Sequence, residues 1–503
     1  MNYYIGIDLG TSALKGILAD ERGTIVRQAT AGYRVLTPAP GWTEQNPADW
    51  LAALDTVLKR LLREPAAGTD IRPGAVEITV AGRVRGISFG GQMHGLVAID
   101  RNGDVLRPCI LWNDARTEKQ TAYLNEVVGK ATLSACTGNI AFAGFTAPKL
   151  LWLKENEPAH FDRICKIMLP KDYLAYSLSG VVATDYSDAS GTLLLDVRHK
   201  RWSRKMADVC GVSPDILPEL HESYDVIGTV RSGIAARYGL CNDVRVVIGA
   251  GDNAAAAIGT GTVHAGDCNI SLGTSGTIFV CTDKMEAVAS NALHSFAHAN
   301  GKWHLMGCIL SAASCRKWWL ETILGTGDYA ADEDEIASCD SGSVLFVPYL
   351  SGERSPHNDV NVKGAFVGLT AATTRAQMSR AVMEGVAFAI RDCLEVAVSN
   401  GLTVSGTGVC GGGAGSAAWR QILADALNLP VEIPATEQGP AYGAAILAMV
   451  GCGAYRDVSD AVRQIIPPGR TIYPDAQAVK RLDAKYRVFT GLYDALKQSM
   501  HAL

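Results

Sequence analysis

Two carboxylates in this sequence stand at the ends of apolar, strand-like runs. The first, Asp8, is followed by the turn Gly10-Thr11-Ser12. The backbone N–H groups and hydroxyls of such a turn form a small concavity that suits an anionic phosphate. Asp8 beside it would hold Mg²⁺ through water, or it would only cap the neighbouring turn. Lys15, on the returning strand, would point either into the phosphate site or to solvent.

Asp252 is the second carboxylate. It follows the β-prone run 244–248 and lies among glycines that leave room for a ligand. Transfer of a phosphoryl group to a hydroxyl requires a base near that hydroxyl, and Asp252 could accept its proton. The alternative is an aspartate that only accepts backbone N–H bonds at a strand end. The residues alone leave both interpretations open.

A third candidate is the cluster Gly411-Gly412-Gly413-Ala414, between a strand-like run and the helix expected from Ala417. Backbone N–H groups and a helix amino terminus could hold a nucleotide phosphate there, or lie beneath an adenosine. The cluster is not closed by Gly-Lys-Ser/Thr, and no suitably placed acid follows it. Both the P-loop and the Rossmann interpretations are therefore excluded.

The Gly-Thr-Ser hairpin occurs twice. Strand, turn and returning strand at 4–20 are repeated at 268–283, where the turn is Gly273-Thr274-Ser275,. The second turn is thus a second candidate for holding phosphate. Because a chain of 503 residues is too long for one ordinary core,, the repeat predicts a duplicated α/β architecture. We expect domains at 1–258 and 259–503, with a glycine-rich hinge near 259–261.

Hydrophobic spacing predicts further elements. Helices are expected at 48–63, 311–324, 375–400, 417–427 and 442–450, and strands at 84–89, 106–112 and 244–248. The acidic stretch 328–340 is expected to be a solvated helix face with its loops.

Composition excludes several classes of function. The net charge is -5 and no basic stripe is present, which argues against nucleic acid as a partner,. No apolar run reaches the ~20 residues that a membrane span needs, and no secretory signal is visible. The 13 cysteines are scattered without the spacing of a zinc or redox motif, as is typical of a reducing, cytoplasmic compartment,.

Three longer motifs resemble one known family. They are Gly-Phe-Thr-Ala-Pro-Lys-Leu-Leu-Trp at 144–152, Tyr-Leu-Ser-Gly-Glu-Arg-Ser-Pro-His at 349–357, and Gly-Ala-Phe-Val-Gly-Leu at 364–369 leading to 381–384. Their order and form are similar to those of the FGGY carbohydrate kinases of the actin-like ATPase superfamily. The resemblance implies two duplicated actin-like (ribonuclease H-like) domains with an interdomain cleft, and ATP and Mg²⁺ as cofactors. Homodimers are common among such kinases, although no pattern here identifies an interface.

The resemblance also assigns the sugar site. The turn at 91–95 is similar to that of family members that phosphorylate xylulose, where the pair corresponding to Met93 and His94 meets the ketose. The segment 112–116 resembles one that lies beside the sugar, which implies contacts from Trp112 and Asp114. The segment 251–253 resembles the one that carries the catalytic base.

By this resemblance Asp252 is the base and Asn253 a substrate contact. The implied reaction is phosphorylation of the C5 hydroxyl of D-xylulose by ATP. Many relatives have Arg where this chain has Gly415, which removes any contact made by that side chain. Two alternatives remain: a kinase for ribulose, gluconate or glycerol, and an actin-like chaperone or filament protein that needs no sugar.

Overall fold

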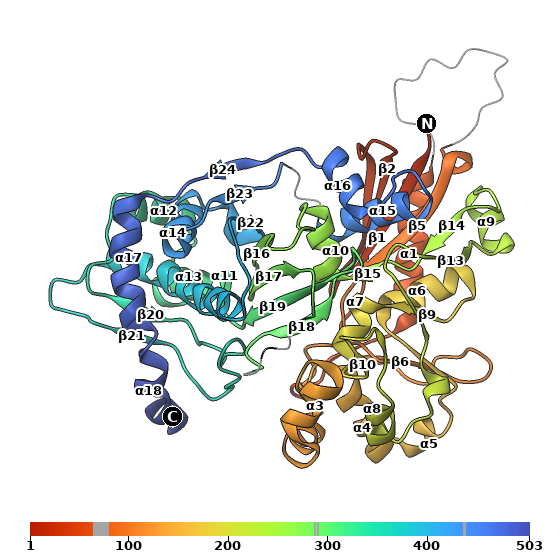
Figure 1. The fold of residues 1–503 in the computed structure, drawn as a ribbon, viewed down its shortest axis with the longest axis horizontal. Helices are drawn as coiled ribbons and strands as arrows, with labels where there is room; N and C mark the ends of the chain where they lie inside the picture. Colours follow the sequence, from red (N-terminus) through yellow and green to blue (C-terminus); the bar gives the residue numbers. More distant parts are fainter. Residues whose placement is uncertain (64–79, 286–287, 289–290, 436–438) are drawn as a thin grey trace. The chain divides into compact units, whose positions relative to one another are not determined.

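The computed structural model describes residues 1–63, 80–285, 288, 291–435 and 439–503. The chain forms two compact units, each with a sheet and packed helices (Figure 1). Unit 1 comprises 1–263, 295–303 and 438–467, and unit 2 comprises 264–294, 304–437 and 468–503. The expected domain limits at 258 and 259 stay a prediction. The sequence reading did not anticipate that 438–467 returns to unit 1.

The sheet of unit 1 has the strand order β13-β14-β5-β1-β2-β3, with β15 also paired to β5. The strand β1 is antiparallel to β2 and parallel to β5, and β5 is parallel to both β14 and β15. The bounds are β1 Tyr3–Leu9, β2 Ala13–Asp20, β3 Ile25–Gly32, β5 Val84–Gly91, β13 Val226–Thr229, β14 Arg245–Val247 and β15 Ala250–Gly251.

The two faces of β1 pack against different elements. Ile5 and Ile7 are buried in one core with helix α1, Pro47–Leu62. Gly6 faces α15, Gly439–Gly451, where a Cβ atom would lie 1.9 Å from the carbonyl oxygen of Ala441. Successive side chains alternate along a strand, so Asp8 lies on the face of Gly6, near the carboxyl end of the strand.

Local signals in the sequence explain where α1 begins. The side chain of Asn46 accepts the N–H of Ala48, and Pro47 occupies the first turn, where its missing N–H costs nothing,. Trp50, Leu54 and other residues at helical spacing are buried against the sheet,. The helix expected at 48–63 is therefore confirmed.

The remaining elements of unit 1 are shorter. Its other helices are α2 Glu118–Ala122, α3 Lys130–Thr137, α4 Thr146–Asn156, α5 Pro158–Phe161, α6 Pro170–Ser179, α7 Tyr186–Ala189, α8 Arg204–Cys210, α9 Ser232–Tyr238, α10 Asp252–Gly259 and α16 Val458–Ile465. The short strands are β4 Glu44–Gln45, β6 Val97–Ile99, β7 Cys109–Ile110, β8 Lys166–Met168, β9 Ala183–Asp185, β10 Leu195–Asp196, β11 Arg201–Trp202 and β12 Glu219–His221.

The sheet of unit 2 repeats the plan of unit 1. Its order is β18-β19-β17-β16-β22-β23-β24. In it β16 is antiparallel to β17 and parallel to β22, and β23 is parallel to β22 and antiparallel to β24. The run β17-β16-β22-β23-β24 therefore has the same order and the same strand directions as the run β2-β1-β5-β14-β13 in unit 1. The duplicated α/β fold predicted from the repeated hairpin is thus confirmed. The bounds are β16 Cys268–Leu272, β17 Gly276–Thr282, β19 Trp303–Ile309, β22 Thr407–Cys410, β23 Val431–Ile433 and β24 Arg470–Ile472.

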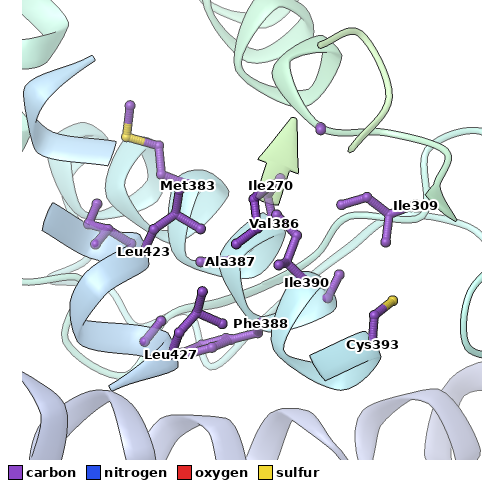
Figure 2. Packing of buried hydrophobic residues seen from close by; sticks show 14 of the residues in the cluster. Ile270, Ile309, Met383, Val386, Ala387, Phe388, Ile390, Cys393, Leu423 and Leu427 are labelled. Carbon is purple, nitrogen blue, oxygen red and sulfur yellow. The ribbon is translucent and has the colours of Figure 1, made fainter. Parts of the chain in front are cut away.

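The core of unit 2 forms around one long helix, α13 Arg375–Ser399. Its residues Met383, Val386 and Ile390 pack between strand residues such as Ile270 and the helix α14, which carries Leu423 (Figure 2). The side chain of Thr374 accepts the N–H of Gln377, and that of Gln377 returns the bond, which begins α13 with a capping box,. The helices are α11 Ala313–Lys317, α12 Tyr329–Ala337, α13 Arg375–Ser399, α14 Ala417–Leu427, α17 Ala476–Phe489 and α18 Leu492–His501, with strands β18 His294–Ala297, β20 Leu345–Val347 and β21 Ala365–Val367.

Two expected elements differ in the structure. The strand predicted at 106–112 is only the two-residue β7, because Arg107 is held in a buried ion pair with Glu44 and Pro108 has no N–H to donate,. The helix predicted at 311–324 changes from α11 to a π-helical turn, η5 Trp318–Ile323. The acidic stretch is also less solvated than expected, because Asp332 is buried in an ion pair with Arg316.

Close packing of α10 on α15 gives a stability prediction. A Cβ atom on Gly443 would lie 1.8 Å from the carbonyl oxygen of Ala255, so the helices would have to separate. We expect Gly443→Ala to lower the free energy of unfolding by ~1–3 kcal/mol or more, measured by urea denaturation. Gly233→Ala, on the exposed helix α9, meets no atom within 4 Å and should be neutral or stabilising,. Equal stability of the two variants would contradict this packing.

Candidate active site

Three strand ends of unit 1 bring the predicted chemistry together. Asp8 lies opposite Gly90 of β5 and Lys15 of β2, and Gly251 lies opposite Gly91. Because β1, β5 and β15 are parallel, their carboxyl ends share one edge of the sheet, where α/β folds usually bind ligands. Asp252, the first residue of α10, follows β15 directly. The two carboxylates singled out in the sequence thus lie at one edge.

The carboxylate of Asp252 is held by two hydrogen bonds, and its pKa is raised. Its Oδ1 atom accepts the backbone N–H of Asn253 at 2.8 Å and the side-chain N–H of Asn253 at 3.0 Å. Burial raises the pKa of Asp252 to about 7, and the negative charge of Asp8 adds to this rise. Burial also raises the pKa of Asp8 to about 6, while Lys15 opposes it. A carboxyl group that titrates near neutrality suits a general base.

The first Gly-Thr-Ser turn is tied to the adjoining polar residues by Thr11. Its hydroxyl donates to Oε1 of Gln92 at 3.3 Å and accepts the indole N–H of Trp112 at 3.0 Å, while its carbonyl accepts Nε2 of Gln45 at 2.6 Å. Ser12 is exposed and Gly10 partly exposed. The structure therefore brings Thr11 to Trp112, whereas the sequence assigned one to phosphate and the other to sugar. Gln45 was missed because no motif marks it.

His94 is held in a defined tautomer. Its Nδ1 atom lies 2.8 Å from the carbonyl oxygen of Gly191, and because a carbonyl only accepts, Nδ1 carries the proton,. In the neutral ring Nε2 is then an acceptor. The ring stacks on Phe145 at a centroid distance of 4.7 Å. His94 also has a φ of 71°, a left-handed conformation that orients the turn,.

Glycines let the Met-His turn lie close to the strand ends. A Cβ atom on Gly191 would lie 2.3 Å from the ring of His94, and one on Gly251 would lie 3.0 Å from Met93. Met93 itself is buried. The predicted sugar residues Met93 and His94 are therefore brought next to the segment that carries Asp252.

A buried lysine, Lys149, holds the backbone of the same turn. Its ammonium group donates to the carbonyl oxygen of His94 at 2.9 Å and to that of Gly144. Thr146 donates to the same His94 oxygen at 3.1 Å. Burial lowers the pKa of Lys149 to about 7. Lys149 belongs to the motif at 144–152, but sequence reasoning gave it no role.

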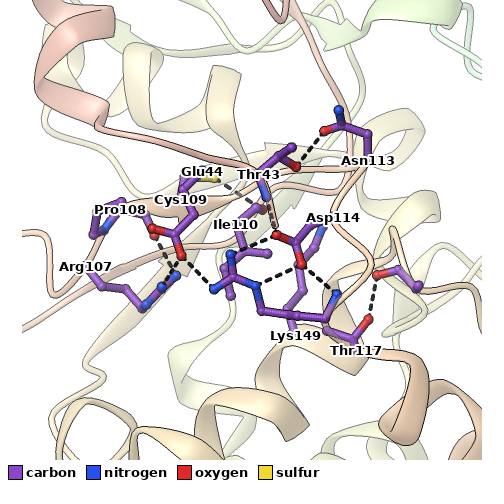
Figure 3. Close-up of polar contacts among 12 residues, drawn as sticks. Thr43, Glu44, Arg107, Pro108, Cys109, Ile110, Asn113, Asp114, Thr117 and Lys149 are labelled. Carbon is purple, nitrogen blue, oxygen red and sulfur yellow. Dashed lines mark hydrogen bonds and ion pairs between the residues drawn. The ribbon is translucent and has the colours of Figure 1, made fainter. Parts of the chain in front are cut away.

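Asp114, expected beside the sugar, lies in a network of polar contacts (Figure 3). Its carboxylate is buried, accepts the N–H of Thr43 at 2.6 Å, and pairs with Arg116 at 2.8 Å. Arg116 in turn pairs with Glu44 at 2.6 Å and lies over the ring of Trp42 at 3.9 Å. Direct contact of Asp114 with a substrate stays a prediction. The observed bonds make it an anchor for the segment that carries Trp112.

The second Gly-Thr-Ser turn lies in unit 2 between β16 and β17. The carbonyl of Gly273 accepts the N–H of Ala313 at 2.9 Å, and that of Thr274 accepts the N–H of Ala312 at 2.9 Å. The hydroxyl of Ser314 also donates to the Thr274 carbonyl, at 2.8 Å. The amino end of α11 thus fixes this turn, and no bond of this kind was visible from the sequence.

The glycine cluster of unit 2 lies against the end of β16. Gly411 has a φ of 85°, and a Cβ atom there would lie 2.8 Å from the backbone of Leu272. A Cβ atom on Gly412 would meet nothing within 4 Å. Beside the cluster is a pocket of ≈ 330 Å³. It is lined by Thr274, Ala313, Ser314, Arg316, Lys317, Tyr329, Gly412, Gly413, Ser416 and Trp419.

Glu333 supports one wall of this pocket. Its carboxylate accepts the hydroxyl of Ser416 at 2.6 Å and the N–H of Ala418 at 2.7 Å, and it pairs with Arg316 at 3.1 Å. These bonds fix the amino end of α14 directly after Ala414. The glycine cluster and the second turn, predicted separately, are therefore brought to one pocket through Thr274 and Gly412.

The residues at the edge of unit 1 fit a magnesium ion held with substrate. Among the described residues, no group of three or more His, Cys, Asp or Glu side chains is placed to hold a metal. Asp8 offers carboxylate oxygens beside the first turn, on the strand next to Lys15. Mg²⁺ in kinases is commonly held by one or two carboxylates, waters and substrate phosphates. The single carboxylate of Asp8 fits this mode of binding.

Two family models match nearly the whole chain. The model of the N-terminal domain of the FGGY family of carbohydrate kinases matches residues 3–259, and that of the C-terminal domain matches 268–452. The chain belongs to the FGGY family of carbohydrate kinases. Sugar kinases of this family use ATP as a substrate. Within the described residues, no helix is long and apolar enough to cross a membrane.

Relatives of this FGGY kinase match over full length. The xylulose kinase of Lactococcus lactis is 39% identical, covering 100% of this chain and 99% of the relative, and that of Escherichia coli is 39% identical, covering 98% and 99%. A crystal structure of a xyloylose kinase from Brucella ovis is 40% identical with a TM-score of 0.91, covering 99% and 100%. The family and the actin-like fold expected from the motifs are confirmed.

The raised pKa of Asp252 predicts an effect on stability that needs no activity measurement. Since the folded pKa is about 7, the ionised form is penalised in the folded state, and the penalty grows from pH ~4 to ~7 and then levels off,. Asp252→Asn removes the charge. We expect it to raise the free energy of unfolding at pH 8 by ~1–3 kcal/mol, with little gain at pH 4.5.

The control is Asp208→Asn, at an exposed aspartate of α8. Urea denaturation at both pH values compares the variants with the unaltered protein. A stability gain for Asp252→Asn that is the same at pH 4.5 and pH 8 would mean that Asp252 is not held in a desolvated state.

Proposed function

We propose that this FGGY kinase is a xylulose kinase, which transfers the γ-phosphoryl group of ATP to the C5 hydroxyl of D-xylulose. The products are D-xylulose 5-phosphate and ADP. The observation that carries the proposal is the full-length identity of 39% with xylulose kinases from two bacteria. The turn of Met93 and His94 beside Asp252 supports it, because it gives a sugar hydroxyl both a directional acceptor and a nearby base.

The sugar is held in unit 1 by four side chains. His94 accepts a sugar hydroxyl at Nε2, since Nδ1 is committed to the carbonyl of Gly191. Trp112, whose indole N–H bonds Thr11 and whose side chain is 40% exposed, offers an apolar ring face to sugar carbons,. Met93 and Asn253 complete the contacts.

Asp252 is the general base. Its carboxylate accepts the proton of the sugar C5 hydroxyl. As the proton leaves, the hydroxyl oxygen forms a bond to the γ-phosphorus of ATP, and the bond from that phosphorus to the bridging oxygen of the departing ADP breaks. A pKa of about 7 leaves much of the carboxylate ionised at neutral pH and still makes it basic enough to take the proton. The bonds from Asn253 keep the carboxylate in place.

Each unit by itself offers backbone and polar groups that suit nucleotide phosphates. In unit 1 these are Gly10, Thr11, Ser12 and Lys15, and in unit 2 they are Gly273, Thr274, Ser275, Gly411, Gly412, Gly413 and Ala414. Asp8 would hold Mg²⁺, and the ion would neutralise part of the phosphate charge. The pocket beside Gly412 suits part of the nucleotide, since it is lined by Gly412 and Gly413 as well as by Trp419,.

Gluconate is the second candidate substrate. A gluconate kinase from Lactobacillus acidophilus is 25% identical over 98% of both chains, with a TM-score of 0.91. A xylulose kinase from the same organism is equally distant, 25% identical with a TM-score of 0.92. Structural similarity at this distance therefore does not separate the two sugars, whereas the full-length identities of 39% favour xylulose.

A sugar panel with coupled ADP detection tests the substrate. D-xylulose should give kcat/KM at least ~10-fold above D-ribulose, gluconate and glycerol, because a site built for specific hydroxyls penalises their absence.

The role of Asp252 as the base is tested with a variant. Asp252→Asn should lower kcat by ~10²-fold or more. In the unaltered enzyme kcat/KM should fall ~10-fold per pH unit below pH ~7, as Asp252 becomes protonated,. Preference for another sugar would overturn the substrate, and a fully active Asp252→Asn would overturn the base.

The magnesium role of Asp8 is tested separately. Asp8→Asn keeps the shape of the side chain but removes its charge, so the Mg²⁺ concentration for half-maximal rate should rise ~10-fold or more at saturating D-xylulose. Asp208→Asn serves as the matched control. An unchanged Mg²⁺ requirement in Asp8→Asn would remove Asp8 from the metal site.

A further inference from the structure

The backbone that carries Asp252 is bonded to a buried serine. The hydroxyl of Ser187 accepts the N–H of Gly251 at 3.1 Å and lies 2.5 Å from Oδ2 of Asp185. The hydroxyl must donate to the carboxylate, because an ionised carboxylate only accepts. Its lone pairs therefore point to Gly251, the residue directly before Asp252. Ser187, Asp185 and Gly251 are all buried.

Asp185 is itself fixed from several sides. Its Oδ2 atom also accepts the backbone N–H of Ser187 at 2.9 Å and the hydroxyl of Ser223 at 2.6 Å. Its Oδ1 atom pairs with the ammonium group of Lys171 at 2.9 Å. The side chains of Asp185 and Lys171 are both fully buried. The serine is thus held by a carboxylate that has little freedom to move.

Lys171 anchors more than this one carboxylate. Its ammonium group lies 2.6 Å from Asp172 and 3.7 Å from Asp188, both fully buried. Burial alone would lower the pKa of Lys171, but the three carboxylates raise it above its ordinary value. Burial raises the pKa of Asp188 well above its ordinary value.

The cluster lies directly behind the strand ends of the active site. A Cβ atom on Gly91 would lie 2.9 Å from Cβ of Lys171, and Gly91 pairs with Gly251. The helix α6 can therefore approach β5 this closely only because Gly91 has no side chain. No residue of the cluster is among those assigned to ATP, sugar or metal.

We propose that Ser187, anchored through Asp185 and Lys171, is a positioning residue that sets where Asp252 lies during phosphoryl transfer. The inference rests on the proposed function, in which Asp252 is the base. A base that is displaced by about 1 Å loses much of its effect, since rates fall steeply with misplacement. The bond from Gly251 to Ser187 restrains the backbone one residue away from that base.

The structure supplies a matched control for this role. Ser223 donates to the same Oδ2 atom of Asp185 at 2.6 Å and is equally buried, but its hydroxyl does not bond the backbone of residues 250–253, all of which the structure describes. Ser223→Ala and Ser187→Ala therefore remove the same kind of bond from the same carboxylate. Only Ser187→Ala also removes the acceptor of the Gly251 N–H.

The experiment compares the steady-state kinetics of these two variants with those of the unaltered enzyme. We expect Ser187→Ala to lower kcat ~10-fold or more while KM for ATP stays within about twofold, because the base is misplaced and the nucleotide site is not. Ser223→Ala should keep kcat within about threefold. Thermal unfolding should shift further for Ser187→Ala, since it loses its bond to Asp185 and also leaves the buried Gly251 N–H without this acceptor, so the kinetics of both variants are measured well below their unfolding midpoints,.

Two outcomes overturn the inference. One is an equal loss of kcat in both variants, which would mean that Ser187 acts only through general stability. The other is a kcat for Ser187→Ala that is unchanged in a folded protein. If the unaltered enzyme does not phosphorylate D-xylulose, the proposed substrate fails instead, and the comparison of the two serine variants is made with the sugar that the enzyme does accept.

Discussion

The parallel pairing of β5 with β1 and with β15 is the constraint on which the candidate site depends. It places Asp8, the turn that follows Gly91, and Asp252 at one edge of a single sheet. Such proximity is possible because the facing positions are glycines, where side chains would collide with Lys171 or Met93. The candidate residues of unit 1 lie close together because glycines at the strand ends let neighbouring segments pack closely.

Buried charges hold the backbone around this edge. Lys149 fixes the carbonyl of His94, Arg116 and Asp114 fix the segment of Trp112, and Lys171 fixes Asp185. Buried ion pairs add little net stability, because desolvation offsets their attraction. Their value here is geometric, since each one restrains a segment that carries a predicted substrate contact or the base.

The duplicated sheets use one plan for two purposes. Both units place a Gly-Thr-Ser turn between antiparallel strands and extend the first strand with parallel neighbours. In unit 1 the parallel strands β5 and β15 lead into Met93 and Asp252, which suits a sugar and a base. In unit 2 the corresponding strand β22 leads into Gly411, beside a pocket lined by Gly412, Gly413 and polar and aromatic side chains, which suits a nucleotide.

The sequence by itself determined the repeat, the family and most of the long elements. Helix signals such as Asn46 before Pro47 are local, and motifs such as that at 144–152 are contiguous, so both are readable without a fold. The prediction of a strand at 106–112 was wrong, because Arg107 forms an ion pair with the distant Glu44 and only β7 pairs as a strand. Only the tertiary structure decided that Thr11 bonds Trp112, that Asp114 is committed to Arg116, and that Ser187 holds Gly251. These contacts join residues far apart in the chain, and no local pattern of side chains specifies which distant partner a buried polar group will find.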